Sequence, residues 1–387
     1  MPASKTIFDI IQYYAYNFIM KIAVIAGEKS GDNYGAYLID ALRRQRTDIS
    51  ILGTGGESIR EKSDIFIEGM PSGQMGFSGV VSRLPLFYRA FNRVKDAIER
   101  EKPSFIVFID NPGFNLKLAE VFGRHIPCFY YIPPKVWAHN YQRVKTIKKN
   151  IRAVIAIFPF ERGIYEKEGI PVVWFGHPVQ DLINKDIPQK EAQTTPVMGL
   201  LPGSREEEVK YLLPVFLRLA RKVSAARRVK VVLSASDRDI RKTEEAILNK
   251  YPSGAEIEIR EGNPHNVITE SSIVLAASGT VNLEVALFKR PLLVFYKTTA
   301  LNYLLARLMV KLEMVSPVNL LAGERVVPEY IQRFPYSKIA GDITEILDKG
   351  RLYQREMAVF TRLESDIRSS NVSAAVAAFL MQEIKKR

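Results

Sequence analysis

The chain contains one cysteine, Cys128, among its 387 residues. It therefore cannot form an internal disulfide, and a reducing compartment suits such a sequence. No stretch approaches the ~20 apolar residues that a membrane-spanning helix requires. The histidines are few, and their spacing is not typical of a metal cluster: His125, His139, His177 and His265. The sequence thus predicts a protein without a disulfide, a membrane span, a metal site or another cofactor.

Basic residues outnumber acidic ones, with 55 Lys and Arg against 42 Asp and Glu and a net charge of +13. A surface of this kind favours anionic substrates, an anionic membrane or nucleic acid. No signature of RNA or DNA binding accompanies the charge, so nucleic acid is not an expected partner.

The order of apolar runs and helical patterns predicts two similar domains, as the length does at roughly 100–200 residues per domain. Strands are expected at Lys21–Ala26, Ile49–Gly53, Ser104–Ile109, Phe129–Ile132 and Arg152–Ile157. After a polar linker at Asp181–Pro196, further strands are expected at Val197–Leu201, Lys230–Ser234, Ile273–Ala276 and Pro291–Phe295. Apolar strands alternating with helices form parallel sheets that are covered on both faces.

The expected fold is therefore α/β, with two Rossmann-like doubly wound domains. We expect the domains at residues 20–183 and 190–349, and C-terminal helices at 350–387 that cross back to the first domain. Residues 1–19 precede a second methionine, Met20. They are either a short amphipathic helix or a segment ahead of the true start.

The most distinctive feature of the second half is the turn Ser278-Gly279-Thr280, between an expected strand and an expected helix. The first backbone N–H groups of a helix have no partner within the helix and favour anions. Gly279 allows a phosphate to approach the backbone, and Ser278 and Thr280 can bond to it. Glu284, one turn further, can accept ribose hydroxyls. The alternative is an ordinary capped helix with a solvent-exposed glutamate.

A second turn of the same kind, Pro202-Gly203-Ser204-Arg205, follows another expected strand. It adds the guanidinium of Arg205, a group that binds phosphate through two parallel hydrogen bonds. Taken alone, Arg205 is equally well interpreted as a surface residue at a helix start. Two such turns in one domain are more specific than either, and together they predict a nucleotide-phosphate site.

In the first half, Asp110 opens the segment Asp110-Asn-Pro-Gly-Phe-Asn115 at the end of an expected strand. A carboxylate at the carboxyl end of a parallel strand can act as a general base in a cleft. The alternative is a cap on the next helix. The glycine-rich segment Gly27–Asp32 lies at another strand end and suits a close approach of the backbone to a ligand.

Three basic stretches are candidates for contact with an anionic surface. The run Arg143, Lys145, Lys148 and Lys149 suits an acceptor phosphate or anionic lipid, or is a solvent-exposed helix face. The stretches Met75–Phe91 and Leu301–Val315 combine apolar and basic residues. They are either helices that lie on a membrane surface or helices that pack on the sheets.

Together these motifs resemble one family. They occur in order as Gly27-Glu-Lys-Ser-Gly-Asp32, Asp110-Asn-Pro-Gly-Phe-Asn115, Val136-Trp-Ala138, Phe158-Pro-Phe-Glu161, Gly176-His177, Leu201-Pro-Gly-Ser-Arg205, Ala277-Ser-Gly-Thr-Val-Asn-Leu-Glu284 and Asn319-Leu-Leu-Ala-Gly323. This combination resembles the lipid-A-disaccharide synthases, from about Met20 into the C-terminal helices.

The resemblance implies an inverting GT-B glycosyltransferase that needs no metal, with its two domains facing a cleft. The implied donor is UDP-2,3-diacylglucosamine and the implied acceptor is 2,3-diacylglucosamine 1-phosphate, giving the lipid A disaccharide and UDP for lipopolysaccharide synthesis. Such an enzyme is cytoplasmic and peripheral on the inner-membrane surface, and a homodimer is compatible with it.

The resemblance also implies roles for residues. Asp110 matches the candidate base and Arg205 the phosphate-binding arginine of the reaction. The expected donor site comprises Gly203, Ser204, Arg205, Ser278, Gly279, Thr280, Glu284 and Asn319. The expected acceptor side comprises Ser30, Gly31, Asp32, Asn115 and Arg143.

The chain departs from the usual family pattern at Gly79, at Gly113 and at Pro133-Pro134-Lys135, all in the expected acceptor domain. Two alternatives remain open. One is a GT-B UDP-sugar enzyme with a different acceptor, or an epimerase of similar fold. The other is a non-catalytic paralogue that binds UDP or lipid.

Overall fold

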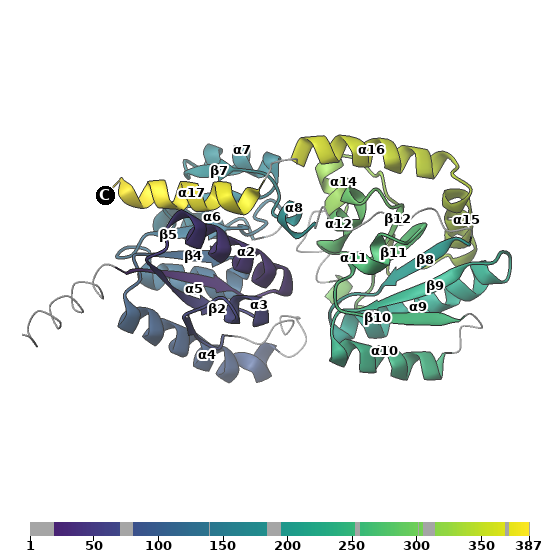
Figure 1. The fold of residues 1–387 in the computed structure, drawn as a ribbon, viewed down its shortest axis with the longest axis horizontal. Helices are drawn as coiled ribbons and strands as arrows, with labels where there is room; N and C mark the ends of the chain where they lie inside the picture. Colours follow the sequence, from purple (N-terminus) through teal and green to yellow (C-terminus); the bar gives the residue numbers. More distant parts are fainter. Residues whose placement is uncertain are drawn as a thin grey trace, which may run out of the picture. The chain divides into compact units, whose positions relative to one another are not determined.

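The computed structural model describes residues 19–69, 80–138, 140–183, 195–251, 256–300, 302–304, 314–367 and 371–386. The chain divides into two compact units: one runs up to Leu182 and resumes at Ser369, and the other is Ile183–Arg368 (Figure 1). The expected N-terminal extension up to residue 18, Gly79, His139, most of the linker, and parts of the stretches 75–91 and 301–315 lie outside the described residues.

Among the described residues, the first unit contains a seven-stranded parallel sheet in the order β3-β2-β1-β4-β5-β6-β7. Its strands are β1 (Met20–Ala26), β2 (Ile49–Thr54), β3 (Ile65–Phe66), β4 (Phe105–Ile109), β5 (Cys128–Tyr131), β6 (Ala153–Ala156) and β7 (Val172–Trp174). Strands β4, β5 and β6 are buried along their whole length, because helices cover both faces of the sheet. The strand order reverses between β1 and β4.

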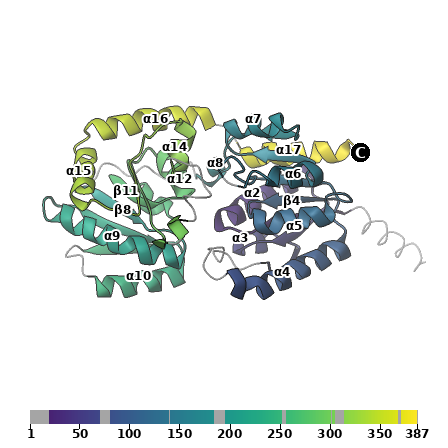
Figure 2. The same ribbon diagram turned by 180° about the vertical axis from the view of Figure 1, so that it is seen from behind.

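Helices cover the two faces of this sheet. On one face, α2 (Lys29–Gln45) and α17 (Val372–Lys385) pack side by side. On the other face lie α4 (Val80–Glu101), α5 (Pro112–Phe122) and α6 (Arg143–Asn150), which share an apolar cluster with the strands (Figure 2). The other described helices of the unit are α3 (Glu57–Arg60), α7 (Pro159–Lys167) and α8 (Val179–Leu182).

The C-terminal helix α17 belongs to the first unit, which confirms that the chain crosses back, whereas α16 (Arg351–Ile367) stays in the second. The Asp181 carboxylate accepts hydrogen bonds from the backbone N–H groups of Val372 (3.0 Å) and Ser373 (2.7 Å). At the other end, Arg152 donates from Nη2 to the carbonyl of Glu383 (2.9 Å). Both ends of α17 are thus fixed to the first unit by polar contacts.

The second unit repeats the same plan with a six-stranded parallel sheet among its described residues, in the order β10-β9-β8-β11-β12-β13. Its strands are β8 (Val197–Leu201), β9 (Lys230–Ala235), β10 (Ile257–Glu261), β11 (Ile273–Ala277), β12 (Leu292–Tyr296) and β13 (Glu329–Ile331). The order reverses between β8 and β11. The expectation of two doubly wound parallel sheets is therefore confirmed.

The helices of the second unit again lie on two faces. One group is α9 (Glu206–Ser224), α10 (Arg238–Lys250) and α15 (Tyr336–Leu347), which share one apolar cluster with the strands. The other group is α11 (His265–Ile268), α12 (Val281–Leu287), α14 (Pro317–Ala322) and α16. Among the described helices of both units, none is long and apolar enough to cross a membrane.

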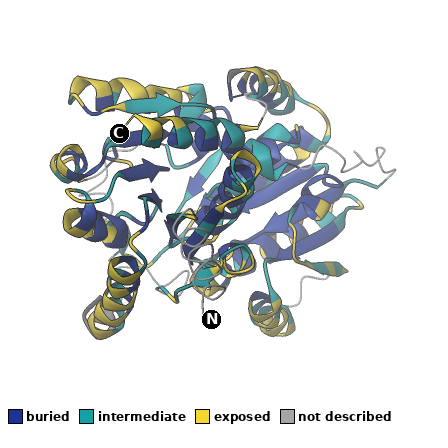
Figure 3. Ribbon diagram, turned by 60° about the vertical axis from the view of Figure 1, so that its left-hand side comes forward, coloured by how far each residue is buried: buried dark blue, intermediate teal, exposed yellow. Residues whose placement is uncertain are grey.

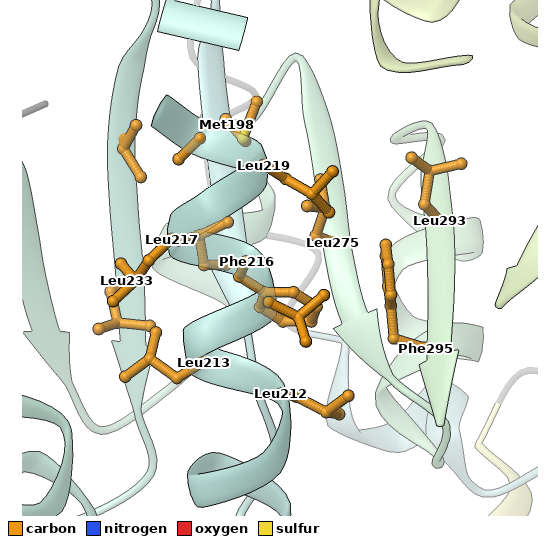
Figure 4. Close-up of a cluster of buried hydrophobic side chains, with 14 of the residues drawn as sticks. Met198, Leu212, Leu213, Phe216, Leu217, Leu219, Leu233, Leu275, Leu293 and Phe295 are labelled. Atoms are coloured by element: carbon orange, nitrogen blue, oxygen red, sulfur yellow. The ribbon is translucent and has the colours of Figure 1, made fainter. Parts of the chain in front are cut away.

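Helix α9 supports one of the predicted phosphate turns. Its first turn carries three glutamates and its last turn carries Arg221 and Lys222, which suits the helix dipole. Its apolar side faces the strands, with Phe216 against Phe295 at a ring distance of 4.9 Å and an angle of 73° (Figure 4). Figure 3 shows the same division more generally: the central strands are mostly buried, and exposed residues lie on the outer sides of the helices.

We expect Asp181→Ala to loosen α17, because its first backbone N–H groups lose a carboxylate cap worth about 1–2 kcal/mol. Hydrogen–deuterium exchange measured by mass spectrometry should accelerate in residues 372–385. The matched control is Asp239→Ala, since Asp239 is 90% exposed and pairs only at the surface with Lys242. Unchanged protection of α17 in the Asp181 variant would contradict this account.

Candidate functional site

In the first unit, the loops after β1 and β4 meet where the strand order reverses. Ala26 and Ile109 are paired at the ends of these strands, so Gly27 and Asp110 emerge side by side. A Cβ added to Gly27 would lie 2.0 Å from Nδ2 of Asn111. The close approach that glycine permits here is therefore to the Asp110–Asn111 loop of the protein itself.

Asp110 lies in a strained turn. Asp110 and Asn111 have φ values of +51° and +45°, a left-handed conformation that costs free energy in residues other than glycine. The Asp110 carbonyl accepts hydrogen bonds from the Tyr130 hydroxyl (2.6 Å) and from Nδ2 of Asn115 (2.8 Å). The N-cap position of α5 is Asn111, whose side chain makes no capping bond. The Asp110 side chain is half-buried at the strand end.

Tyr130 connects this loop to a predicted acceptor residue, Arg143. Burial raises the pKa of Tyr130 well above its ordinary value; the Asp110 charge raises this pKa further, and the Arg143 charge lowers it. Both charges therefore act on one buried hydroxyl. Sequence analysis did not single out Tyr130, because a tyrosine within an apolar strand is typical of a core.

Two of the expected acceptor residues hold the loops together. The Asp32 carboxylate accepts hydrogen bonds from the backbone N–H groups of three residues at the start of α3: Gly56 (2.8 Å), Ser58 (3.0 Å) and Ile59 (3.0 Å). Nδ2 of Asn115 donates to the carbonyls at the ends of two strands: Ile25 (3.4 Å), Ile109 (3.2 Å) and Asp110 (2.8 Å). We assign Asp32 and Asn115 to the framework of the site. Ser30 and Gly31 lie beside Asp32 in the first turn of α2.

In the second unit, the two predicted phosphate turns follow neighbouring strands. Leu201 of β8 pairs with Ala276 of β11, so the turns at 202–205 and 278–280 emerge next to each other at the reversal of strand order. This is the position at which doubly wound sheets bind ligands. The structure thus brings together the two features that the sequence offered separately.

Gly203 and Glu208 shape the first of these turns. Gly203 has φ +121°, and a Cβ there would lie 2.3 Å from Oε2 of Glu208. Burial raises the pKa of Glu208, while the Arg205 charge and the backbone N–H groups of Ser204 and Arg205 oppose that rise. Arg205 is the N-cap of α9 and lies with Nη1 3.3 Å from Oε1 of Glu208. Ser204 and Arg205 are both exposed at the surface of the turn.

The second turn is bonded within the protein at Ser278 and at Gly279, whose N–H donates to Oδ1 of Asn282 (3.3 Å). The Ser278 hydroxyl donates to the carbonyl of Val315 (2.8 Å). Thr280 is the N-cap of α12, and its side chain makes no capping bond. A Cβ added to Gly279 would meet nothing within 4 Å. A ligand atom therefore has room to approach the backbone at Gly279.

Glu284 and Asn319 are buried rather than exposed. Oε2 of Glu284 lies 2.9 Å from Nε2 of His265, so the alternative of a solvent-exposed glutamate is wrong. Asn319 makes four hydrogen bonds within the protein, the full capacity of an amide side chain. Its Nδ2 donates to Val327 O (2.9 Å) and Glu329 Oε1 (2.9 Å), and its Oδ1 accepts from the N–H groups of Val326 (2.8 Å) and Val327 (2.9 Å). We assign Asn319 to the framework of the loop.

His265 and Glu329 are two further residues at this site that the sequence did not indicate. Glu329, at the start of β13, accepts hydrogen bonds from the N–H groups of Ser316 (2.7 Å) and Val315 (3.1 Å), and so holds the segment that Ser278 also contacts. The spacing of histidines in a sequence can indicate a metal cluster, but it does not indicate a histidine that pairs with a carboxylate, as His265 does with Glu284. Among the described residues, no group of three acidic, histidine or cysteine side chains could hold a metal ion.

The basic run at 143–149 serves two places in the first unit. The charge of Arg143 lowers the pKa of the buried Tyr130 hydroxyl. Lys145 and Lys149 line a cavity of about 340 Å³ between α5 and α6, together with Arg124. The remaining lining residues are Glu120, Thr146 and Asn150.

Comparison with known proteins gives one consistent result at the level of sequence. The profile of a family described as lipid-A-disaccharide synthetase matches residues 22–379. The chain is 31% identical over 382 residues to the lipid-A-disaccharide synthase of Geobacter sulfurreducens, covering 95% of this chain and 98% of that protein. It is 32% identical over 377 residues to that of Chromobacterium violaceum, covering 93% and 97%.

Solved structures with little sequence identity share the fold. A structure of S. aureus MnaA with UDP has a TM-score of 0.65 at 13% identity and covers 95% of this chain and 97% of its own. Acinetobacter baumannii MurG has a TM-score of 0.55 at 11% identity, with coverage of 94% and 99%. At these identities the likeness extends to the fold alone.

We expect Gly27→Ala to destabilise the first unit by about 1–3 kcal/mol, the usual cost of overpacking, because the new methyl group collides with Asn111. The thermal midpoint should fall. The matched control is Gly113→Ala, two residues beyond Asn111 along the chain, where a Cβ meets nothing within 4 Å. Equal midpoints for the two variants would show that the Asp110–Asn111 loop can move away from β1.

Proposed function

The chain belongs to the lipid-A-disaccharide synthetase family, and from this premise we propose the substrates and residues of its reaction. It is a glycosyltransferase of the GT-B fold that makes lipid A disaccharide. The donor we propose is UDP-2,3-diacylglucosamine, and the acceptor is 2,3-diacylglucosamine 1-phosphate. The products are the β-1,6-linked disaccharide 1-phosphate and UDP.

The observation that carries this proposal is the pair of turns at the ends of β8 and β11. The helix starts at these turns, with the exposed guanidinium of Arg205, offer positive charge to a diphosphate. The open space beside Gly279 accepts a phosphate oxygen. A protein of the same fold that was solved with UDP, S. aureus MnaA, supports a uridine nucleotide as the ligand.

In the proposed mechanism, Asp110 is the general base. Its carboxylate takes the proton of the acceptor's 6-hydroxyl while that oxygen bonds to the anomeric carbon of the donor. The bond from this carbon to the diphosphate breaks on the opposite face, which inverts the configuration. Arg205 and the turn at Gly279–Thr280 stabilise the charge that develops on the departing UDP.

The acceptor phosphate and the membrane are proposed to use the cations of the first unit. The Arg143 charge lowers the pKa of the Tyr130 hydroxyl, which donates to the Asp110 carbonyl. We assign Arg143 to the acceptor's 1-phosphate. Lys145 and Lys149 are exposed residues of the groove between α5 and α6, and they are assigned to the anionic inner-membrane surface. The expected homodimer stays a prediction.

The direct test of the proposal is product formation. We expect the protein to release UDP from UDP-diacylglucosamine only when the lipid monophosphate is present, with a disaccharide of the summed mass. An epimerase needs no acceptor, and a non-catalytic paralogue binds UDP without forming product. Either of those outcomes replaces the proposed reaction.

Asp110→Asn should lower kcat by about 10²–10⁴, the usual contribution of a general base. UDP affinity, measured by calorimetry, should stay at the wild-type value, since Asp110 belongs to the first unit. The control is Asp96→Asn on α4, because Asp96 is 69% exposed and 3.9 Å from its nearest cation, Lys95. Wild-type turnover in the Asp110 variant rules out the proposed base.

Gly279→Ala and Gly203→Ala should separate ligand contact from folding. In Gly279→Ala the added methyl group fits the free protein, so the thermal midpoint should stay at the wild-type value. The methyl group occupies the space proposed for a phosphate, so UDP affinity should fall by about tenfold or more, equivalent to ~1.4 kcal/mol. Gly203→Ala should lower the midpoint, because φ is +121° and Glu208 blocks the added atom. Gly341→Ala is the control for an added methyl group with free space. Wild-type UDP affinity in the Gly279 variant would place the diphosphate elsewhere.

A further inference from the structure

His265 and Glu284 form a buried pair beside the proposed nucleotide turn. Nε2 of the histidine lies 2.9 Å from Oε2 of the glutamate, and their side chains are 4% and 10% exposed. The backbone of His265 is fixed by bonds to Asn263 Oδ1 (2.9 Å) and from Thr269 Oγ1 (2.8 Å). The ring of Phe288 packs at 5.0 Å and 62° to the imidazole. The histidine is therefore held rigidly and can fix the glutamate in turn.

The surroundings of the imidazole determine which nitrogen carries the hydrogen. Nδ1 of His265 is buried and has no hydrogen-bond partner among the described residues. A hydrogen on Nδ1 would be a buried donor without an acceptor, which is costly, whereas a bare Nδ1 lone pair costs less. The arrangement that satisfies the pair places the hydrogen on Nε2, where it is donated to the glutamate. His265 then donates from Nε2 to the Glu284 carboxylate.

This bond occupies one oxygen of Glu284 and leaves the other. Oε1 has no hydrogen-bond partner in the described parts of the chain. It is also not a fully buried atom. It therefore keeps some exposure, on a side chain that is 10% exposed as a whole. Glu284 follows Thr280 by four residues on α12, which is one helical turn of ~5.4 Å from the proposed phosphate turn.

We propose that His265 is a positioning residue that fixes Glu284 so that its second oxygen accepts the ribose hydroxyls of the donor, and that this pair makes the enzyme select ribonucleotides over 2′-deoxyribonucleotides. The proposal rests on the proposed UDP-sugar site. A glutamate held by a rigid donor presents its acceptor oxygen in one orientation. Without His265, the Glu284 carboxylate rotates among several orientations, and its hydrogen bonds to the sugar hydroxyls lose their geometry.

The test compares UDP with 2′-deoxy-UDP by calorimetry in the wild type, His265→Ala and His265→Gln. We expect the wild type to prefer UDP by about tenfold or more, as sites built to bond a hydroxyl do. His265→Ala should weaken UDP by a similar factor and leave 2′-deoxy-UDP nearly unchanged, so that the preference approaches one. His265→Gln keeps an N–H donor and should restore part of the preference. The control is His125→Ala, an exposed histidine of the first unit.

Steady-state kinetics and a double variant distinguish a positioning role of His265 from a general structural role. With saturating donor, kcat of His265→Ala should stay within about threefold of the wild type while KM rises, since the lost contact acts on binding. Glu284→Ala should lose the same preference, and the double variant should be no worse, because residues of one unit are not additive.

Three results overturn the proposal in distinguishable ways. If the wild type does not bind UDP, the proposed function fails together with the inference. If the wild type prefers UDP and folded His265→Ala keeps that preference, the inference alone fails. Equal weakening of UDP and 2′-deoxy-UDP in both His265 variants assigns the histidine to folding only.

Discussion

The reversal of strand order in each sheet is the constraint on which the rest of the molecule depends. Parallel strands joined by right-handed crossovers place successive helices on one face until the order reverses, and there two neighbouring loops leave toward opposite faces. The strand ends between them stay uncovered. In the first unit these are the ends of β1 and β4, where Gly27 and Asp110 lie, and in the second they are the ends of β8 and β11, where Gly203 and Gly279 lie. The residues to which we assign the chemistry therefore lie where the topology leaves strand ends uncovered.

The central strands of both sheets could be predicted from the sequence, because burial on both faces demands an uninterrupted apolar run. The strands that the sequence did not indicate are β3, β7, β10 and β13, and each is an edge of its sheet. An edge strand has one neighbour, and these are at most partly buried, so their residues need not be continuously apolar. Helix α2 begins at Lys29 and contains two glycines, Gly31 and Gly35. Glycine lowers helix propensity, but Gly35 leaves room for Ile59, whose Cδ1 would lie 2.6 Å from an added Cβ. Tertiary packing outweighed local preference there.

The candidate site was predictable in its position but not in its bonds. The pattern of strand, turn and helix is local, so it identified Asp110, Arg205 and the 278–280 turn. The partner of a polar side chain, in contrast, comes from another segment. Asn319 and Asp32 were expected to bind ligands, yet their bonds are to the protein. Tyr130 and His265 were not expected, because a tyrosine in a strand and a histidine without metal-ligand spacing carry no signal until Asp110 and Glu284 are found beside them.

The return of α17 to the first unit has a consequence for the order in which the two units can fold during synthesis. Helix α17 leaves the ribosome after the whole second unit, yet it packs on α2, which leaves before that unit. The face of α2 that α17 covers stays open while the whole second unit, Ile183–Arg368, is synthesised. The second unit is complete in sequence and free to fold before the first unit is finished, although domains generally fold in the order of synthesis. A chain cut short before residue 371 would lose no strand of either sheet, but its N-terminal unit would lack its cover.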